Sequence, residues 1–175
     1  LHARSVAPSA AGRLLLGAYS GMAKDLTTTL HHITGLRFMG ETPEGMRTMI
    51  DNERNARTGP SPMQLVLHAL AGCSAVDVVA MLGKRRLTIR EYRVEVHGER
   101  PDAVPAPFTR ITARHVFDVP GLDEATARRF VDLAMNKYCS VGASLSAELA
   151  FEIELLHEHP STDELAREAA GEVDD

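Results

Sequence analysis

Two cysteines are the residues of this sequence best suited to do chemistry. Cys73 lies in the stretch AGCSA and Cys139 in the stretch KYCSV, 66 positions further on. A cysteine thiolate can act as a nucleophile and can be oxidised, so either residue could carry thiol chemistry. The alternative is that both are core residues, because free cysteine is often buried and packs like a small hydrophobe.

The glycine that precedes Cys73 adds to this signal. Glycine inside a helix costs about 1 kcal/mol relative to alanine. We therefore expect Gly72 to mark either a close approach of another backbone or open space for a ligand.

The eight histidines do not form a recognisable metal motif. Neither HExxH nor a Cys/His quartet occurs, and no GxSxG is present for a serine hydrolase. His31 and His32 are neighbours on an expected strand, so they point to opposite faces. We expect no bound metal.

A long helix must position Cys73. Ser61 followed by Pro62 is typical of a helix start. From Met63 to Leu82 apolar residues fall on nearly every face, which predicts a buried central helix.

The remaining elements predict an α+β fold. Strand-like patterns alternate with breakers and two shorter helices. The expected elements are a hairpin over 26–39 and 46–50, a loop at 51–59, strands at 92–97 and 108–119 around a proline-rich loop, helices at 123–135 and 141–147, and a strand at 151–155.

We expect three parts along the chain. Residues 1–21 are interpreted as an extension before a natural start at Met22, and residues 22–156 as one domain. Residues 157–175 form an acidic tail, in which a capping box at Ser161 predicts a short helix. We expect the protein in the cytoplasm.

Charge and hydropathy exclude some partners. The formal net charge is −5 without a basic cluster, which argues against nucleic acid. No apolar run approaches the ~18 residues of a membrane span, so we expect no membrane partner.

The two cysteine segments resemble a known family. The stretch GPSPMQLVLHALAGCSAVD at 59–77 is similar to the helix signature of the OsmC/Ohr superfamily, the osmotically inducible and organic hydroperoxide resistance proteins. KYCSV is similar to the second cysteine segment of the branch that carries Pro-Ser-Pro-Met and Gly-Cys-Ser. The resemblance covers roughly residues 36–156.

This resemblance implies a fold and an activity. The fold would be antiparallel strands around a long buried helix, in an intertwined homodimer with sites at the interface. The activity would be a thiol-dependent peroxidase of stress defence that reduces organic hydroperoxides. Cys73 would match the peroxidatic cysteine and Cys139 the resolving one, without metal or bound cofactor. An external dithiol, such as a lipoyl-type reductant, would regenerate both.

One departure from the family pattern concerns activation of the thiol. Much of the family carries a Glu, paired with an upstream Arg, where this chain has Met63. The sequence does not assign the activating cation among Arg47, Arg54 and Arg57. Two alternatives to the peroxidase therefore stay open: a binding protein for small hydrophobic molecules with idle cysteines, and a cysteine-based acyl-transfer enzyme.

Overall fold

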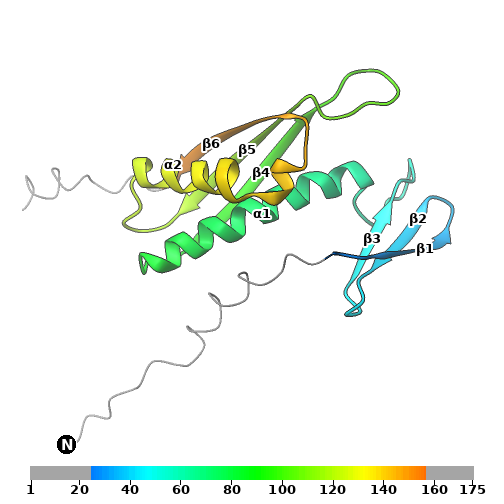
Figure 1. The fold of residues 1–175 in the computed structure, drawn as a ribbon, viewed down its shortest axis with the longest axis horizontal. Coiled ribbons are helices and arrows are strands. Elements are labelled where there is room, and N and C mark those ends of the chain that lie inside the picture. The colour runs from blue at the N-terminus through cyan, green and yellow to red at the C-terminus, as the bar shows by residue number, and fades with distance from the viewer. Residues whose placement is uncertain (1–24, 157–175) are drawn as a thin grey trace, which may run out of the picture. The chain divides into compact units, whose positions relative to one another are not determined.

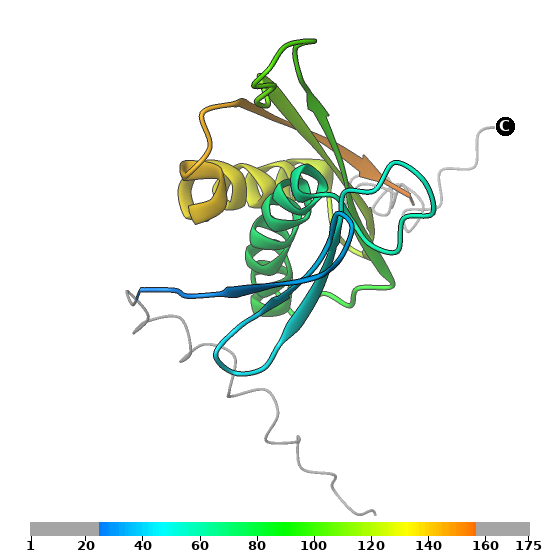
Figure 2. The same ribbon diagram turned by 90° about the vertical axis from the view of Figure 1, so that its right-hand side faces the viewer.

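The computed structural model describes residues 25–156 (Figures 1 and 2). The predicted extension at 1–21 and the predicted tail at 157–175 lie outside the described residues. The chain forms two compact units, with the boundary between Thr58 and Gly59. The single domain expected over 22–156 spans both units and stays a prediction.

Unit 1 is a three-stranded antiparallel sheet. Its strands follow one another in sequence order and pair with their neighbours. They are β1 (Thr29–Thr34), β2 (Arg37–Glu41) and β3 (Arg47–Asp51). The first stretch of the predicted hairpin is divided in two, because Gly35 turns the chain at a φ of +54°, which glycine adopts without steric cost.

Unit 2 contains a long helix, a second sheet and three shorter helical segments. In chain order they are α1 (Pro62–Lys84), β4 (Glu91–Glu99), β5 (Arg110–Asp118), α2 (Glu124–Leu133), the π-helical turn η2 (Ala134–Tyr138), α3 (Ser140–Ala143) and β6 (Glu148–Leu155). The helix predicted over 141–147 is thus a single turn. At its C-terminal end, Ser144 Oγ donates to the Ser140 carbonyl at 2.8 Å.

The sheet of unit 2 has the order β4-β5-β6. Strands β4 and β5 form an antiparallel pair, whereas β6 runs parallel to β5. The predicted α+β class is confirmed, but the expectation of antiparallel strands is wrong for this last pairing. The reason is the connection: the chain crosses over through the helical segments before it returns as β6. Helices α1 and α2 lie on one side of this sheet (Figure 2).

Helix α1 begins where the sequence predicts. Ser61 Oγ accepts a hydrogen bond from the Gln64 backbone N–H at 3.3 Å, and Gln64 Oε1 accepts one from the Ser61 N–H at 2.9 Å. This capping box satisfies two backbone donors that would otherwise lack partners. It fixes the helix register, and hence the face on which Cys73 lies.

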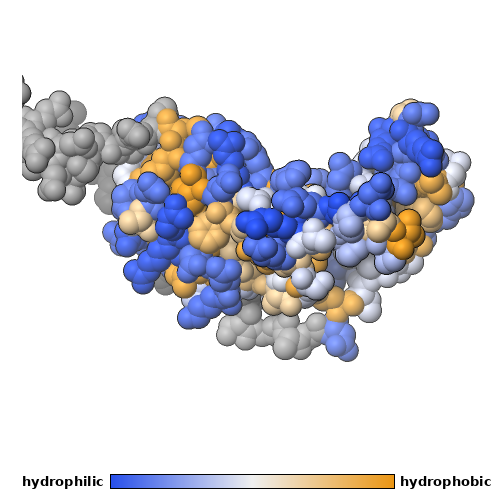
Figure 3. Space-filling model, turned by 90° about the horizontal axis from the view of Figure 1, so that it is seen from above, coloured by the Kyte–Doolittle hydropathy of each residue, from blue (hydrophilic) through white to orange (hydrophobic). Residues whose placement is uncertain are grey.

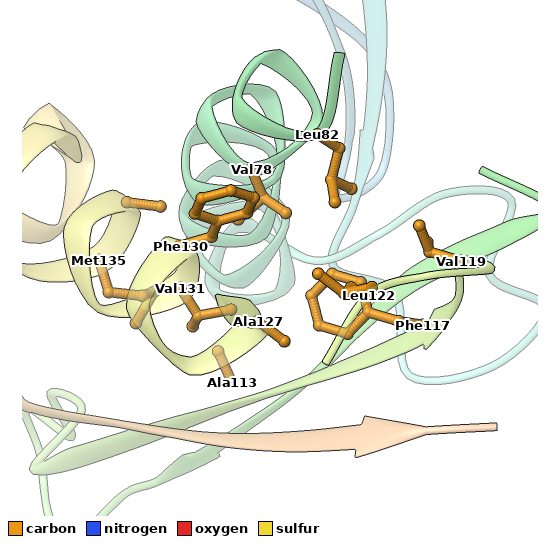
Figure 4. Packing of buried hydrophobic residues seen from close by; sticks show 11 residues of the cluster. Val78, Leu82, Ala113, Phe117, Val119, Leu122, Ala127, Phe130, Val131 and Met135 are labelled. Atoms are coloured by element: carbon orange, nitrogen blue, oxygen red, sulfur yellow. The ribbon is translucent and has the colours of Figure 1, made fainter. Parts of the chain in front are cut away.

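One stripe of α1 is buried. Leu70, Ser74, Val78 and Leu82 follow one another at intervals of four residues. The last two enter the main core between α1, α2 and the sheet, where they pack with Phe117, Phe130 and other residues (Figure 4).

The opposite face of α1 is open within the described residues. Val76 is 53% exposed and Val79 is 42% exposed. The described chain by itself thus buries one stripe of α1, and the cover of the other faces by a second copy stays a prediction.

Helix α1 is also long and apolar enough, by length and composition alone, to cross a membrane. The expectation that no apolar run reaches such a length is therefore wrong. Core helices of globular domains share these properties, and α1 packs its buried stripe into the core of unit 2.

Candidate thiol site

The fold brings the two cysteines together. Cys73 projects from α1 and is half-buried, whereas Cys139, between η2 and α3, is only 4% exposed. Both belong to one apolar cluster. Its buried members are Leu70, Ile111 and Cys139, and the partly buried residues around them are Leu67, Cys73, Val96, Phe108, Val141, Leu145, Ala147 and Leu149.

Backbone hydrogen bonds fix Cys139. Its N–H donates to the Ala134 carbonyl at 2.9 Å across the π-helical turn. Its Sγ accepts from the Gly142 N–H at 3.2 Å and so caps α3. Single π-helical turns occur frequently at functional sites, and here the turn presents a thiol. No sequence pattern predicts this turn, because its residues have ordinary helical propensity.

Burial raises the pKa of Cys139 to about 11. The neighbouring Cys73 side chain acts in the same direction, through a hydrogen bond and through charge, while the backbone N–H groups of Gly142 and Val141 act against it. Cys139 is therefore a protonated thiol near neutral pH, in direct interaction with Cys73.

The surroundings of Cys73 are more open. Ser74 Oγ donates within its own helix, to the carbonyls of Leu70 and Ala71 at 3.1 Å each. A Cβ built on Gly72 would meet no heavy atom of the described residues within 4 Å. Of the two readings of Gly72, open space is the one found in the described chain.

The three candidate cations lie in unit 1, whereas both cysteines lie in unit 2. Arg47 pairs with Glu41 at 2.7 Å, and Arg57 donates to the Glu53 carbonyl at 2.7 Å. Arg54 makes no hydrogen bond or ion pair with any residue in the range 25–156. The choice among the three stays a prediction.

A fourth arginine of unit 1 is better anchored than these three, and sequence reasoning missed it. Arg37 Nε donates to Asp51 Oδ2 at 2.9 Å, and its Nη2 donates to the Ala56 carbonyl at 2.9 Å. The two charged residues are cross-strand partners on β2 and β3. This ion pair could have been predicted only from the register of β2 and β3. The sequence pattern predicts a simple hairpin and does not show that register.

Asp51 itself is fully buried and organises the loop that carries Arg54 and Arg57. It accepts hydrogen bonds from the backbone N–H groups of Glu53 and Thr58 at 2.9 and 2.7 Å. Burial alone would raise its pKa, but these donors and Arg37 hold the pKa well below its usual range. The carboxylate is therefore ionised and ties both ends of the loop to β3.

The sheet face of unit 2 that turns away from α1 and α2 is charged. Hydrophilic residues predominate on the surface seen in Figure 3. A depression of about 340 Å³ lies there, lined by Glu95, Val96, His97, Thr112, Arg114 and Glu152. Strand alternation places these polar side chains across the sheet from the thiols. Among residues 25–156, no three His, Cys, Asp or Glu side chains are grouped as metal ligands.

Together these features define an α+β protein with a pair of neighbouring thiols beside a long helix. The chain belongs to the OsmC-like protein family, whose model matches residues 53–154. It is 38% identical to the protein YhfA of Escherichia coli strain K12 over 113 residues, which cover 65% of this chain and 84% of that protein.

Solved structures show the same fold. An OsmC-like protein of Mycoplasma pneumoniae has a TM-score of 0.67 at 17% identity, with 78% of this chain and 100% of that chain covered. The organic hydroperoxide resistance protein OhrB of Bacillus subtilis has a TM-score of 0.51 at 18% identity, with 74% and 97% covered. Some proteins of this fold are thus described as hydroperoxide resistance proteins.

Proposed function

We propose that this protein is a thiol-dependent peroxidase that reduces organic hydroperoxides to alcohols in cytoplasmic stress defence. The observation that supports this most is the thiol pair: a half-buried Cys73 interacts with a buried Cys139 inside one apolar cluster. The family adds support, since some relatives of this fold carry hydroperoxide resistance in their names.

The reaction follows from the chemistry of two thiols. The Cys73 thiolate attacks the O–O bond and takes the terminal oxygen, and the alkoxide that leaves picks up a proton and becomes the alcohol. Cys73 is now a sulfenic acid. The Cys139 sulfur attacks it, water leaves, and a disulfide forms. An external dithiol, for example of lipoyl type, reduces the disulfide by exchange and is itself oxidised. We propose no resident metal or cofactor for this cycle.

The two thiols divide the roles by exposure. Cys73 is the more accessible to a peroxide. Cys139 is buried, and its high pKa keeps it protonated near neutral pH. A protonated thiol is a poor nucleophile towards a peroxide but can react once a sulfenic acid forms beside it. We therefore assign the peroxidatic role to Cys73 and the resolving role to Cys139.

Activation of Cys73 requires a nearby cation, because an ordinary thiol is mostly protonated at neutral pH. Of Arg47, Arg54 and Arg57, the first and the last already donate to neighbours in unit 1. Arg54 has no such partner among the described residues. We propose that one of these three arginines supplies the cation, and the choice among them stays open.

We propose that the protein works as a homodimer. The open face of α1 carries small and apolar residues at intervals of three or four. They are Ala69, Gly72, Val76, Val79 and Gly83, all of them exposed in the described chain. Apolar helix faces of this kind are stable when another element covers them, and a second copy of the chain would do so.

The test is a count of thiols. One equivalent of cumene hydroperoxide should remove two free thiols per chain, and a dithiol such as dihydrolipoamide should restore both. The alcohol 2-phenyl-2-propanol should appear in an amount equal to the cumene hydroperoxide consumed. If the hydroperoxide leaves both thiols free, the cysteines are idle, and the binding of small hydrophobic molecules becomes the better interpretation of the same cluster.

A further inference from the structure

Phe108 contributes an aromatic side chain to the thiol cluster. It follows the loop between β4 and β5 and packs against the buried group that contains Leu70, Ile111 and Cys139. Its own side chain is only half-buried. Phe108 is therefore positioned as part of the boundary between the thiol cluster and its surroundings.

A glycine on β4 makes room for this ring. A Cβ built on Gly98 would lie 2.4 Å from Phe108 Cε1, 2.6 Å from Phe108 Cδ1 and 3.2 Å from Leu67 Cδ2. Real Cβ atoms essentially never show contacts under 3.0 Å. The ring thus occupies the space that any other residue at position 98 would fill, against the helix that carries Cys73.

The loop also holds the ring. The guanidinium carbon of Arg100 lies 5.9 Å from the centre of the Phe108 ring, within the range of a cation–π contact. Arg100 Nε donates to the Ala106 carbonyl at 2.7 Å and so closes the loop on itself. The position of Phe108 is therefore fixed by Gly98 and by Arg100.

We propose that Phe108 is a specificity-determining residue of the thiol site. Its ring contacts the carbon skeleton of an apolar, bulky hydroperoxide while the peroxide group meets Cys73. This inference rests on the proposed function. Hydrogen peroxide has no carbon skeleton, so the contact favours organic hydroperoxides over it by binding energy alone.

The experiment compares cumene hydroperoxide with hydrogen peroxide as substrates. Phe108→Ala should lower kcat/KM for cumene hydroperoxide by roughly tenfold, the size of effect that a missing apolar contact produces. The value for hydrogen peroxide should stay within about twofold. Gly98→Ala should act in the same direction because it displaces the ring, and Phe108→Leu should retain part of the preference. Val104→Ala is the matched control, since Val104 is fully exposed in the same loop.

Two outcomes would overturn the assignment. Equal losses of kcat/KM for both peroxides would show that Phe108 only supports the fold, and values unchanged for both peroxides in Phe108→Ala and Gly98→Ala would show that the ring does not meet the substrate. A second readout separates this from a failure of the peroxidase itself. In the Cys139→Ser background, N-phenylmaleimide should alkylate Cys73 faster than N-methylmaleimide, and Phe108→Ala should reduce that ratio. If Phe108→Ala leaves the ratio of the two maleimide rates unchanged, the proposal is rejected even if the protein consumes no peroxide.

Discussion

Cys73 and Cys139 are the same side chain in two contrasting settings. Cys73 lies in the middle of a regular helix, half-buried, next to a glycine whose position is open. Cys139 follows an irregular π-helical turn, is buried, and has its sulfur hydrogen-bonded to Gly142. A Cβ on Gly142 would lie 3.0 Å from Leu149 Cδ1, so that glycine is enclosed.

This difference indicates how one residue type can serve two roles. Access favours Cys73 as the thiol that meets a substrate from outside. Burial and a raised pKa suppress reactions of Cys139 with external reagents and leave it available to its neighbour. The access of Cys73 and the burial of Cys139 both depend on the backbone around each residue. Substitutions can test each of these two properties.

Replacing each cysteine should have the largest effect. Cys73→Ser is expected to abolish peroxidase turnover, because the attacking sulfur is gone. Cys139→Ser should still consume one equivalent of hydroperoxide and accumulate sulfenic acid at Cys73, because no thiol intercepts it; a second equivalent would oxidise this to the sulfinic acid. Mass spectrometry of the intact chain, with a sulfenic-acid probe, measures this. Sustained turnover by Cys73→Ser would contradict the division of roles.

Alkylation should reveal the burial of Cys139. In Cys73→Ser, iodoacetamide should modify Cys139 roughly a hundredfold more slowly at pH 8 than it modifies free cysteine, whose pKa is about 8.5. Because burial raises the pKa of Cys139, the rate should keep climbing as the pH rises past 9. Removing Cys73 takes away the two smaller causes that raise the pKa of Cys139, its hydrogen bond and its charge, but leaves burial in place.

The matched protein for this measurement is Cys139→Ser, in which only Cys73 reacts. It should be modified faster than Cys139 at every pH tested, because its side chain is more exposed. A plateau in the Cys139 rate below pH 9 would mean that the segment opens readily in solution, and the contrast between the two settings would fail.

The start of the helix that carries Cys73 could be predicted from the sequence, and the setting of Cys139 could not. The start of α1 depends on the local pattern of Ser61, Pro62 and Gln64, so the sequence was sufficient. The burial of Cys139 depends on Ile111 and Leu149, which reach it through the parallel pairing of β5 and β6. That pairing joins strands far apart in the sequence, and no local pattern specifies it. The same holds for Arg37 with Asp51, and for the ring of Phe108 on Gly98.

Met63 offers a smaller, activating test. Met63→Glu places a carboxylate where much of the family has one, and should raise the rate with organic hydroperoxides several-fold by holding an arginine near a thiolate. Position 63 is ten residues, about 15 Å, from Cys73 along a straight helix. Its effect is therefore expected on the Cys73 of a second copy of the chain.

Gln64→Glu is the matched control for this change. It adds the same charge to the same helical turn but points about 100° away, and a Glu can keep the capping box with Ser61. Steady-state rates of the two variants separate a placed carboxylate from a general effect of negative charge at the helix start. Equal acceleration by both would remove position 63 from the mechanism.

The smallest expected effect is that of Gly72→Ala on stability. The sign of this effect tests whether a second copy of the chain covers α1 at this position. Alanine is favoured over glycine in a helix by about 1 kcal/mol, and nothing in the described chain obstructs a Cβ at this position. A lone chain should therefore gain stability from Gly72→Ala. We expect the opposite, a lower unfolding temperature and weaker self-association in sedimentation equilibrium, because a second copy approaches this face of α1. Gly45→Ala is the comparison variant, because Gly45 in unit 1 also has no heavy atom within 4 Å of a built Cβ. It should lower stability through the strain of its positive φ, and it should leave self-association unchanged because it does not alter α1. If Gly72→Ala stabilises the protein and leaves its self-association unchanged, then the open face beside Cys73 is not covered by another copy.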